Sequence, residues 1–189
     1  AQFAECNDID VIQVPAAAQI DRYTQNFSYM DVVRTDLRGA CVTDQYFEDN
    51  RAQFREELES IFPKAKGKKV LLYMSELRER RDYPQWAFFP DMGQLKEAVG
   101  EEYVVVCNLM ADQLKAGYLN VKELEGFCKF IPASRMGLRR LMIAADVIVG
   151  DYRDTFFESA LLHKPIFSTA TDYEERMKFM NIFIEDFRD

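Results

Sequence analysis

Histidine is nearly absent from this sequence, since His163 is the only one among 189 residues. Proton transfer by histidine would therefore depend on this single side chain. His163 follows a predicted helix and precedes Lys164-Pro165, a position where the expected role is to cap the helix end. Motifs for a catalytic triad, an H-E-x-x-H zinc site, a Walker A loop and a G-x-G-x-x-G fingerprint are lacking as well. We therefore expect no metal and no cofactor.

Cysteine is scarce and widely spaced. The four cysteines form no C-x-x-C pair, which excludes a zinc ribbon and a thioredoxin-type motif. We expect reduced thiols in a cytoplasmic protein. Cys107 and Cys128 stand within apolar runs, where a free cysteine packs as a small hydrophobic residue.

Long apolar runs and an excess of positive charge are also lacking. No window reaches the roughly 18 apolar residues that a membrane span needs, and the N-terminus has no signal-peptide pattern. The net charge of −8 argues against a nucleic-acid partner. The lysines between 64 and 69 are expected to form a solvated loop before a strand. Because the first residue is Ala1, we expect the chain to be cut from a longer protein.

What the sequence does contain is a regular alternation of strand-like and helix-like patterns. Apolar runs predict strands at Asp10–Val14, Met30–Thr35, Lys69–Met74, Tyr103–Cys107, Phe127–Ile131, the run before Gly150, and Pro165–Ser168. Helical spacing predicts helices over 49–62, 91–99, Leu109–Ala116, Met136–Ala144, Asp154–Leu162 and Tyr173–Met180. This order predicts an α/β fold, a Rossmann-like parallel sheet with helices on both faces.

The stretch from Ala144 to Glu158 is the centre of this pattern. Its apolar run ends in Gly150-Asp151-Tyr152, and helical spacing follows at once. A buried strand that opens into a helix N-terminus is where open α/β sheets bind ligands.

Several blocks of the sequence resemble one enzyme family. The blocks AADVIVGDY (144–152), FFE (156–158), LL (161–162) and KPIF (164–167) resemble the "AD-x-LITDYSS-xx-FD…LL-x-KP-x-xF" block of the CDP-glycerol:polyglycerophosphate glycerophosphotransferases. Upstream, KKVLLYMSELR (68–78) is similar to the family's "KK-x-ILYAPT-x-R", with Arg78 on the motif arginine. The spacing of the blocks agrees over about two-thirds of the chain, which makes the resemblance fairly specific.

The resemblance implies the C-terminal half of a GT-B fold. Residues 1–47 would be the end of the preceding domain and a crossover segment, and 48–189 the nucleotide-binding-like domain. Such enzymes transfer glycerol phosphate from CDP-glycerol to a polymer or lipid-linked acceptor in teichoic-acid-type cell-wall synthesis. The family's "HG-x-x-x-K" motif is not in this sequence, so catalysis would need an N-terminal domain. Peripheral association with the inner face of the plasma membrane would come through regions outside the chain.

The resemblance also implies a diphosphate site at the strand ends. Arg78 and Arg153 would neutralise the phosphates. The remaining candidates belong to the same turn and helix: Asp151, Tyr152, Asp154 and Glu158. Other interpretations of these residues stay open. Arg153 and Asp154 could form a surface ion pair. Asp151 could simply end the strand, and Glu158 could complement the helix dipole.

Two departures from the family pattern motivate a second hypothesis from a different function class. Met110 occupies the place of a motif histidine, and Arg153-Asp154 replaces two serines. A carboxylate of Asp154 at a helix N-cap would compete with phosphate. A divergent, non-catalytic interaction module is therefore the alternative, and the nucleotide-binding half of a UDP-sugar enzyme is a further one.

Overall fold

The computed structural model describes residues 11–14, 34–37, 41–74, 91–108, 125–170 and 172–176. The chain forms two compact units, residues 1–48 and 49–189. In the first unit, strands β1 (Val11–Val14) and β2 (Arg34–Leu37) pair in parallel, and a 3-10 helix, η2, covers Cys41–Phe47. The sequence prediction for β2, Met30–Thr35, overlaps the observed strand at only two residues.

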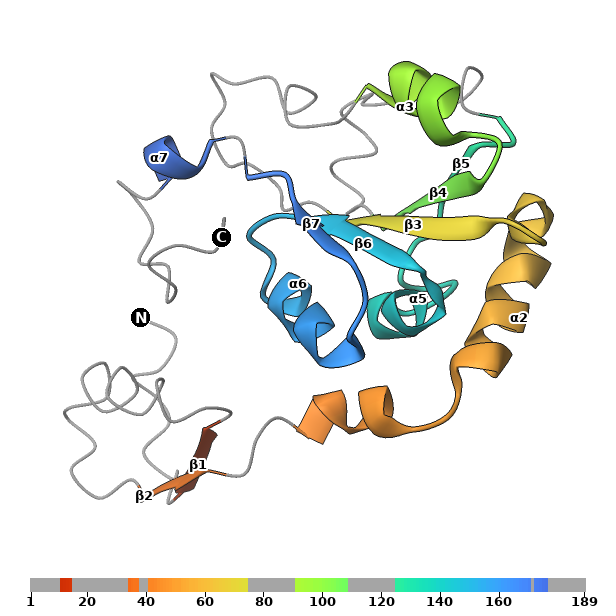
Figure 1. Cartoon of the computed structure of the whole chain (residues 1–189). Coiled ribbons are helices and arrows are strands. Elements are labelled where there is room, and N and C mark those ends of the chain that lie inside the picture. The colour runs from red at the N-terminus through yellow and green to blue at the C-terminus, as the bar shows by residue number, and fades with distance from the viewer. Residues whose placement is uncertain are drawn as a thin grey trace. The chain divides into compact units, whose positions relative to one another are not determined.

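The second unit contains a five-stranded sheet in which every pair is parallel (Figure 1). The strands are β3 (Lys69–Met74), β4 (Tyr103–Cys107), β5 (Cys128–Phe130), β6 (Val147–Gly150) and β7 (Ile166–Ser168). Their order is β5-β4-β3-β6-β7, so the chain proceeds outward from β3 to β5 and then returns to place β6 on the other side of β3. The switch point of the topology therefore lies between β3 and β6, where sheets of this class bind ligands.

Helices cover both faces of this sheet, which confirms the predicted α/β architecture. Figure 1 shows one face covered by α2 (Arg51–Ile61), α5 (Leu138–Ala144) and α6 (Asp154–Glu158), and the other by α3 (Met92–Val99). Three short segments complete the described helices: η3 (Pro63–Ala65), η5 (Ser159–Leu162) and α7 (Tyr173–Arg176). None of the helices in the described ranges is both long and apolar enough to cross a bilayer.

The three central strands β4, β3 and β6 form because most of their residues are apolar and buried between the helical layers. On the α3 face, Tyr73 packs in one cluster with Met92, Val105, Cys107 and Cys128. Cys107 and Cys128 are free and buried, with their sulfur atoms 3.4 Å apart. Burial, together with Cys128, raises the pKa of the Cys107 thiol well above its usual range. Both thiols therefore act as core residues, as their apolar surroundings in the sequence predict.

Helix boundaries follow the local capping chemistry, and the predicted N-cap of α6 needs a correction. Asp91 caps α3, because its Oδ1 accepts from the backbone N–H groups of Gly93 (2.9 Å) and Gln94 (3.0 Å). The predicted N-cap at Asp154 is wrong, since Arg153 has the extended N-cap backbone and Asp154 is the first residue of α6. The predicted helix over Asp154–Leu162 is divided into α6 and η5, and it ends at His163, whose φ of 50° is the left-handed C-cap conformation.

Charged side chains hold the amino ends of β3 and β6 together. The Oδ2 atom of Asp146, directly before β6, accepts from the backbone N–H of Val70 (2.7 Å) and from Arg55 (2.9 Å). Its Oδ1 accepts from Arg51 at 2.7 Å. Arg55 also donates to the carbonyl oxygens of Ala65 and Lys68. The Asp146 carboxylate thus joins β3 to α2, and Arg55 joins α2 to the segment before β3.

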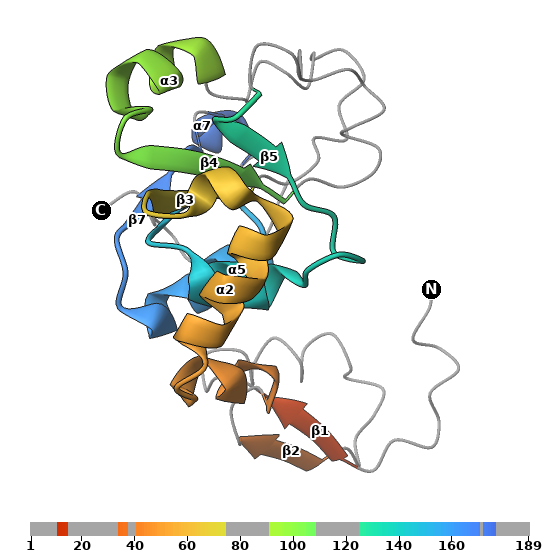
Figure 2. The same ribbon diagram turned by 90° about the vertical axis from the view of Figure 1, so that its right-hand side faces the viewer.

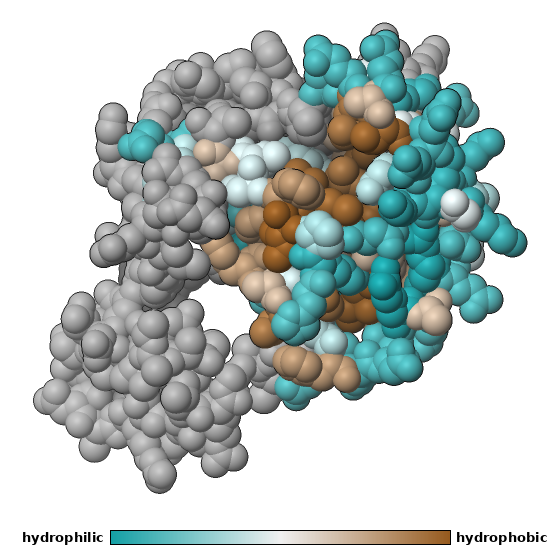
Figure 3. All heavy atoms as spheres, viewed as in Figure 1, coloured by the Kyte–Doolittle hydropathy of each residue, from teal (hydrophilic) through white to brown (hydrophobic). Residues whose placement is uncertain are grey.

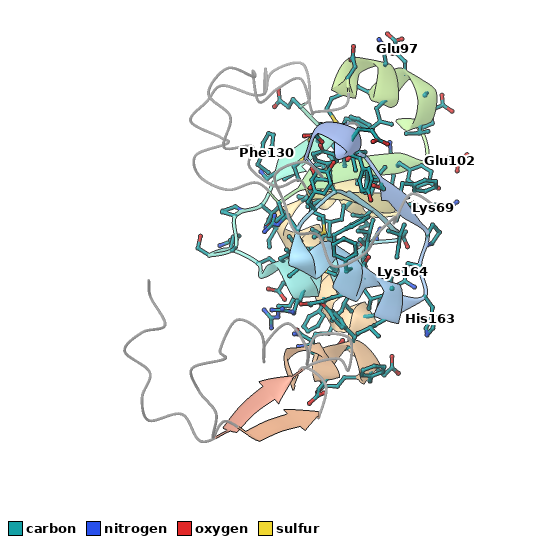
Figure 4. The ribbon with its side chains drawn as sticks, turned by 90° about the vertical axis from the view of Figure 1, so that its left-hand side faces the viewer. Lys69, Glu97, Glu102, Phe130, His163 and Lys164 are labelled. Atoms are coloured by element: carbon teal, nitrogen blue, oxygen red, sulfur yellow. The ribbon has the colours of Figure 1, made fainter. Side chains whose placement is uncertain are left out.

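Lys164 completes this end of the domain (Figure 4). Its ammonium group donates to the carbonyl oxygens of Met142 (2.8 Å) and Ala145 (2.7 Å), and also to that of Ile143, at the C-terminus of α5. Burial lowers the pKa of Lys164 to about 8, and the positive charge of Arg51 adds to this shift. The cation therefore caps α5 in a position that is costly for its charged form.

Polar and apolar surfaces are separated. Figure 3 shows hydrophilic side chains along α2 and hydrophobic ones gathered in the middle of the view. The exposed large hydrophobic residues of this unit include Ile166 and Phe167 on β7, of which Phe167 is 59% exposed. In the described part of the chain, β7 is an edge strand of the sheet.

Candidate functional site

The carboxyl end of β6 is built around a glycine that the packing requires. A Cβ atom on Gly150 would lie 2.6 Å from the ring of Phe156 on α6 and 2.7 Å from the carbonyl oxygen of Met74 on β3. The first turn of α6 therefore lies directly against the switch point between β3 and β6. A side chain at this position would force the helix away from the strand end.

Asp151 and Tyr152 follow that glycine, and both are buried. Asp151 is 1% exposed, and its Oδ1 accepts from the backbone N–H of Tyr152 at 2.7 Å. The Tyr152 hydroxyl donates to Oδ1 of Asp172 at 3.0 Å. Thr169, directly after β7, donates both its N–H (2.7 Å) and its hydroxyl (3.1 Å) to the Gly150 carbonyl. These two predicted site residues thus shape the turn and connect it to the segment after β7.

Arg153 extends across the carboxyl ends of the strands. Its Nη1 donates to the backbone carbonyl of Asn108 at 3.1 Å and, more weakly, to the Asn108 side-chain oxygen at 3.4 Å. Asn108 follows β4 and is 4% exposed, and its own amide donates to the carbonyl of Ile131 after β5 at 3.1 Å. Hydrogen bonds thus run from the end of β6 through the end of β4 to the end of β5.

Asn108 is a residue that sequence reasoning missed. The signal for it was a polar side chain directly after the buried strand Tyr103–Cys107. Its backbone N–H also donates to the carbonyl of Tyr73 on β3 at 3.0 Å, so Asn108 contacts the neighbouring strand as well. A buried amide with this many partners holds its orientation firmly.

Glu158 is engaged away from the strand ends. It is the last residue of α6, and its two carboxylate oxygens accept from Nε and Nη2 of Arg139 on α5, each at 2.7 Å. This bidentate ion pair joins α5 to α6. The structure therefore places Glu158 in a contact between helices.

Two residues and one side chain of the sequence prediction lie outside what the structure describes. Arg78 and Met110 belong to segments 75–90 and 109–124, which are outside the described residues, and so does the side chain of Asp154. The described neighbours show only where these segments start, at the carboxyl ends of β3 and β4. Among the described residues, no group of three or more metal-binding side chains is clustered.

Comparison with known proteins decides the family. The model of the family described as CDP-glycerol:poly(glycerophosphate) glycerophosphotransferase matches residues 3–188. This chain belongs to that family. The resemblance inferred from the motif blocks is thereby confirmed.

Curated members of this glycerophosphotransferase family are similar over most of the chain. The teichoic acid poly(glycerol phosphate) polymerase of Bacillus subtilis (strain 168) is 25% identical over 187 residues, which is 97% of this chain and 24% of the polymerase. The teichoic acid ribitol-phosphate primase of Bacillus spizizenii is 26% identical over 174 residues, or 90% of this chain and 43% of the primase. The chain spans about a quarter to less than half of these relatives.

Solved structures agree on the fold. The wall teichoic acid polymerase TagF is similar with a TM-score of 0.68 and 20% identity, covering 91% of this chain and 41% of TagF. A TagF variant soaked with CDPG for 15 minutes has a TM-score of 0.68 and covers 94% of this chain and 44% of that one. The predicted Rossmann-like parallel sheet with helices on both faces is thereby confirmed.

Proposed function

We propose that this chain is the nucleotide-binding part of a glycerophosphotransferase. It would bind CDP-glycerol at the carboxyl ends of β3 and β6, and the whole protein would transfer glycerol phosphate to a polymer or lipid-linked hydroxyl in teichoic-acid-type synthesis. The observation that carries the proposal is the family match over residues 3–188. In this proposal residues 1–47 end a preceding domain, and residues 48–189 bind the nucleotide.

The arrangement at the strand ends supports a diphosphate site there. β6 pairs with β3, so the segment that carries Arg78 leaves the sheet beside the turn that carries Arg153. The bonds from Arg153 to Asn108 orient the guanidinium without adding a negative charge. In this proposal Arg78 and Arg153 would both bind phosphate oxygens, for which the guanidinium group offers bidentate recognition.

The chemistry that follows is a displacement at phosphorus. The acceptor hydroxyl oxygen forms a bond to the phosphorus that carries glycerol, the bond from that phosphorus to the bridging oxygen breaks, and CMP leaves with the electron pair. Arg78 and Arg153 would stabilise the charge that develops on the leaving phosphate. The hydroxyl proton would go to a base in a domain that corresponds to the unmatched part of the relatives.

A lipid-linked acceptor would place this reaction at the inner face of the plasma membrane. Association there would be peripheral and would involve other parts of the protein. Sedimentation of the full-length protein with vesicles of anionic phospholipid tests this point, and recovery of all the protein in the supernatant contradicts it.

Titration calorimetry with CDP-glycerol tests the binding proposal. We expect a dissociation constant between about 1 μM and 1 mM, weakened by Arg78→Ala and by Arg153→Ala. Lys96→Ala, an exposed lysine on α3, is the matched control and should bind as the wild type does. Absence of heat at millimolar CDP-glycerol overturns the proposal. CDP should compete better than UDP, and the opposite order would favour a UDP-sugar enzyme.

A further inference from the structure

A second concave site lies at the β5 edge of the sheet. A hollow of about 450 Å³ opens between the C-terminal end of α2 and the turn that follows β5. Figure 2 shows the connection from β5 to α5 beside α2. The hollow is lined by Ile61, Lys129, Phe130, Pro132, Ser134 and Arg135. Its volume is within the range of roughly 300 to 1,000 Å³ that is usual for ligand sites.

The charge of this hollow is unusual for the domain. Its lining residues include two cations, Lys129 and Arg135, and none of those lining residues is acidic. Both cations are exposed, and neither has an ion-pair partner among the residues that the structure describes. Other arginines differ, since Arg55 and Arg139 each contact a carboxylate within 3.0 Å. Lys129 and Arg135 therefore make the hollow a local positive site in a chain whose net charge is −8.

The remaining lining side chains suit a ligand that is not a bare anion. Phe130 and Pro132 offer apolar surface beside the cations, and Phe130 is only half-buried at the sheet edge (Figure 4). Ser134 adds a hydroxyl that can donate or accept. A short carbon chain that carries phosphate groups would contact both kinds of surface.

The hollow is also joined to the candidate nucleotide site by hydrogen bonds. Pro132 follows Ile131, whose carbonyl accepts from Asn108, and Asn108 in turn accepts from Arg153. One continuous set of contacts along the strand ends therefore connects the turn after β6 with the wall of the hollow.

We propose that this hollow binds phosphodiester groups of the polyol-phosphate acceptor chain. The inference rests on the proposed function and specifies where the acceptor is held. Lys129 and Arg135 would contact phosphate oxygens. The apolar lining would contact the polyol carbons. Because one hollow carries both cations, a chain with two phosphate groups would bind more tightly than a single phosphate.

Fluorescence anisotropy with a labelled hexamer of glycerol phosphate tests the inference on the full chain. The double variant Lys129→Gln/Arg135→Gln should bind the hexamer roughly tenfold more weakly at low salt, and added salt should weaken wild-type binding. Lys69→Gln/Lys96→Gln removes the same charge elsewhere and should stay within about twofold of wild type. Thermal unfolding of each variant confirms that it is folded.

Three results would overturn the inference. They are equal hexamer affinity in the two double variants, binding of inorganic phosphate as tight as that of the hexamer, and loss of CDP-glycerol affinity in the Lys129/Arg135 variant with hexamer affinity unchanged. The calorimetric test with CDP-glycerol is separate. Failure of that test alone removes the nucleotide proposal, whereas failure of hexamer binding alone removes only the acceptor site.

Discussion

Arg153 Nη1 lies 3.1 Å from the carbonyl oxygen of Asn108, so the end of β6 is bonded to the end of β4 although β3 lies between these strands. The contact therefore passes the end of β3, where the segment with Arg78 begins. Because Asn108 is buried and bonded to three neighbouring elements, it fixes the position of the arginine. We interpret Asn108 as a positioning residue.

Asn108→Ala tests this role through a double-mutant cycle. We expect a loss of about 1 to 3 kcal/mol of unfolding free energy, because Ile131 loses its donor and Arg153 one of its acceptors. CDP-glycerol affinity should also fall. In an Arg153→Ala background the effect on affinity should vanish while the effect on stability remains. Calorimetry and urea unfolding measure the two effects, and an additive loss of affinity would contradict the role.

Gly150→Ala should destabilise the domain. Its Cβ would meet the Met74 carbonyl at 2.7 Å, a backbone atom that cannot rotate away, so we expect a cost of about 1 to 3 kcal/mol. Gly137→Ala is the control, since nothing lies within 4 Å of a Cβ there and only the loss of a glycine N-cap, below about 1 kcal/mol, is expected. Equal unfolding midpoints for the two variants would contradict the close packing of α6 on β6.

Asp146→Ala should cost about 2 to 4 kcal/mol of unfolding free energy. The change removes the acceptor of the Val70 N–H and the carboxylate of Arg51, and it leaves Arg55 with Glu59 as its remaining carboxylate partner. Glu102→Ala is the matched control, because its ion pair with Lys69 is exposed and 3.7 Å long, and its loss should cost less than about 1 kcal/mol. Chemical denaturation of both variants provides the comparison.

The pH dependence of stability should carry a contribution from Lys164. Its pKa in the folded protein is about 8, lowered from 10.5, so above pH 8 the unfolded chain binds more protons at this site than the native one. Stability contributed by this site therefore rises with pH between about 8 and 10.5 and is smallest below pH 8.

Lys164→Arg isolates this contribution, because arginine does not titrate in that range. The stability of the wild type relative to Lys164→Arg should increase from pH 7.5 to pH 9.5. Solvent screening reduces the size of this increase in relative stability, because the Lys164 side chain is partly exposed. A difference that is constant across this range would contradict the lowered pKa.

Strand positions were predictable where the sequence contains long apolar runs. The predicted bounds of β3 and β4 agree with the structure because both strands are buried on both faces and need continuous apolar residues. The short strand β2 was displaced by several residues, since only two of its four residues lie in the predicted segment. Length alone does not explain this difference, since β1 is also four residues long and was predicted to within one residue.

The site was only partly predictable, because its contacts depend on strand order. The turn at Gly150-Asp151-Tyr152 was found from its sequence, but its bond to Asn108 requires β4 and β6 to flank β3. The N-cap was misplaced by one residue for a different reason. The cap is defined by the extended backbone of Arg153 and not by the capping preference of the Asp154 side chain.

Strand β6 is only four residues long, yet both of its ends are fixed. Asp146 holds the amino end to α2 and β3, and Gly150 holds the carboxyl end against Phe156 and Met74. The conformational entropy of β6 and of the turn that follows it is therefore lost when the domain folds and not when a ligand binds. Amide hydrogen exchange in β6 should accordingly be slow before any nucleotide binds, and binding should change it little.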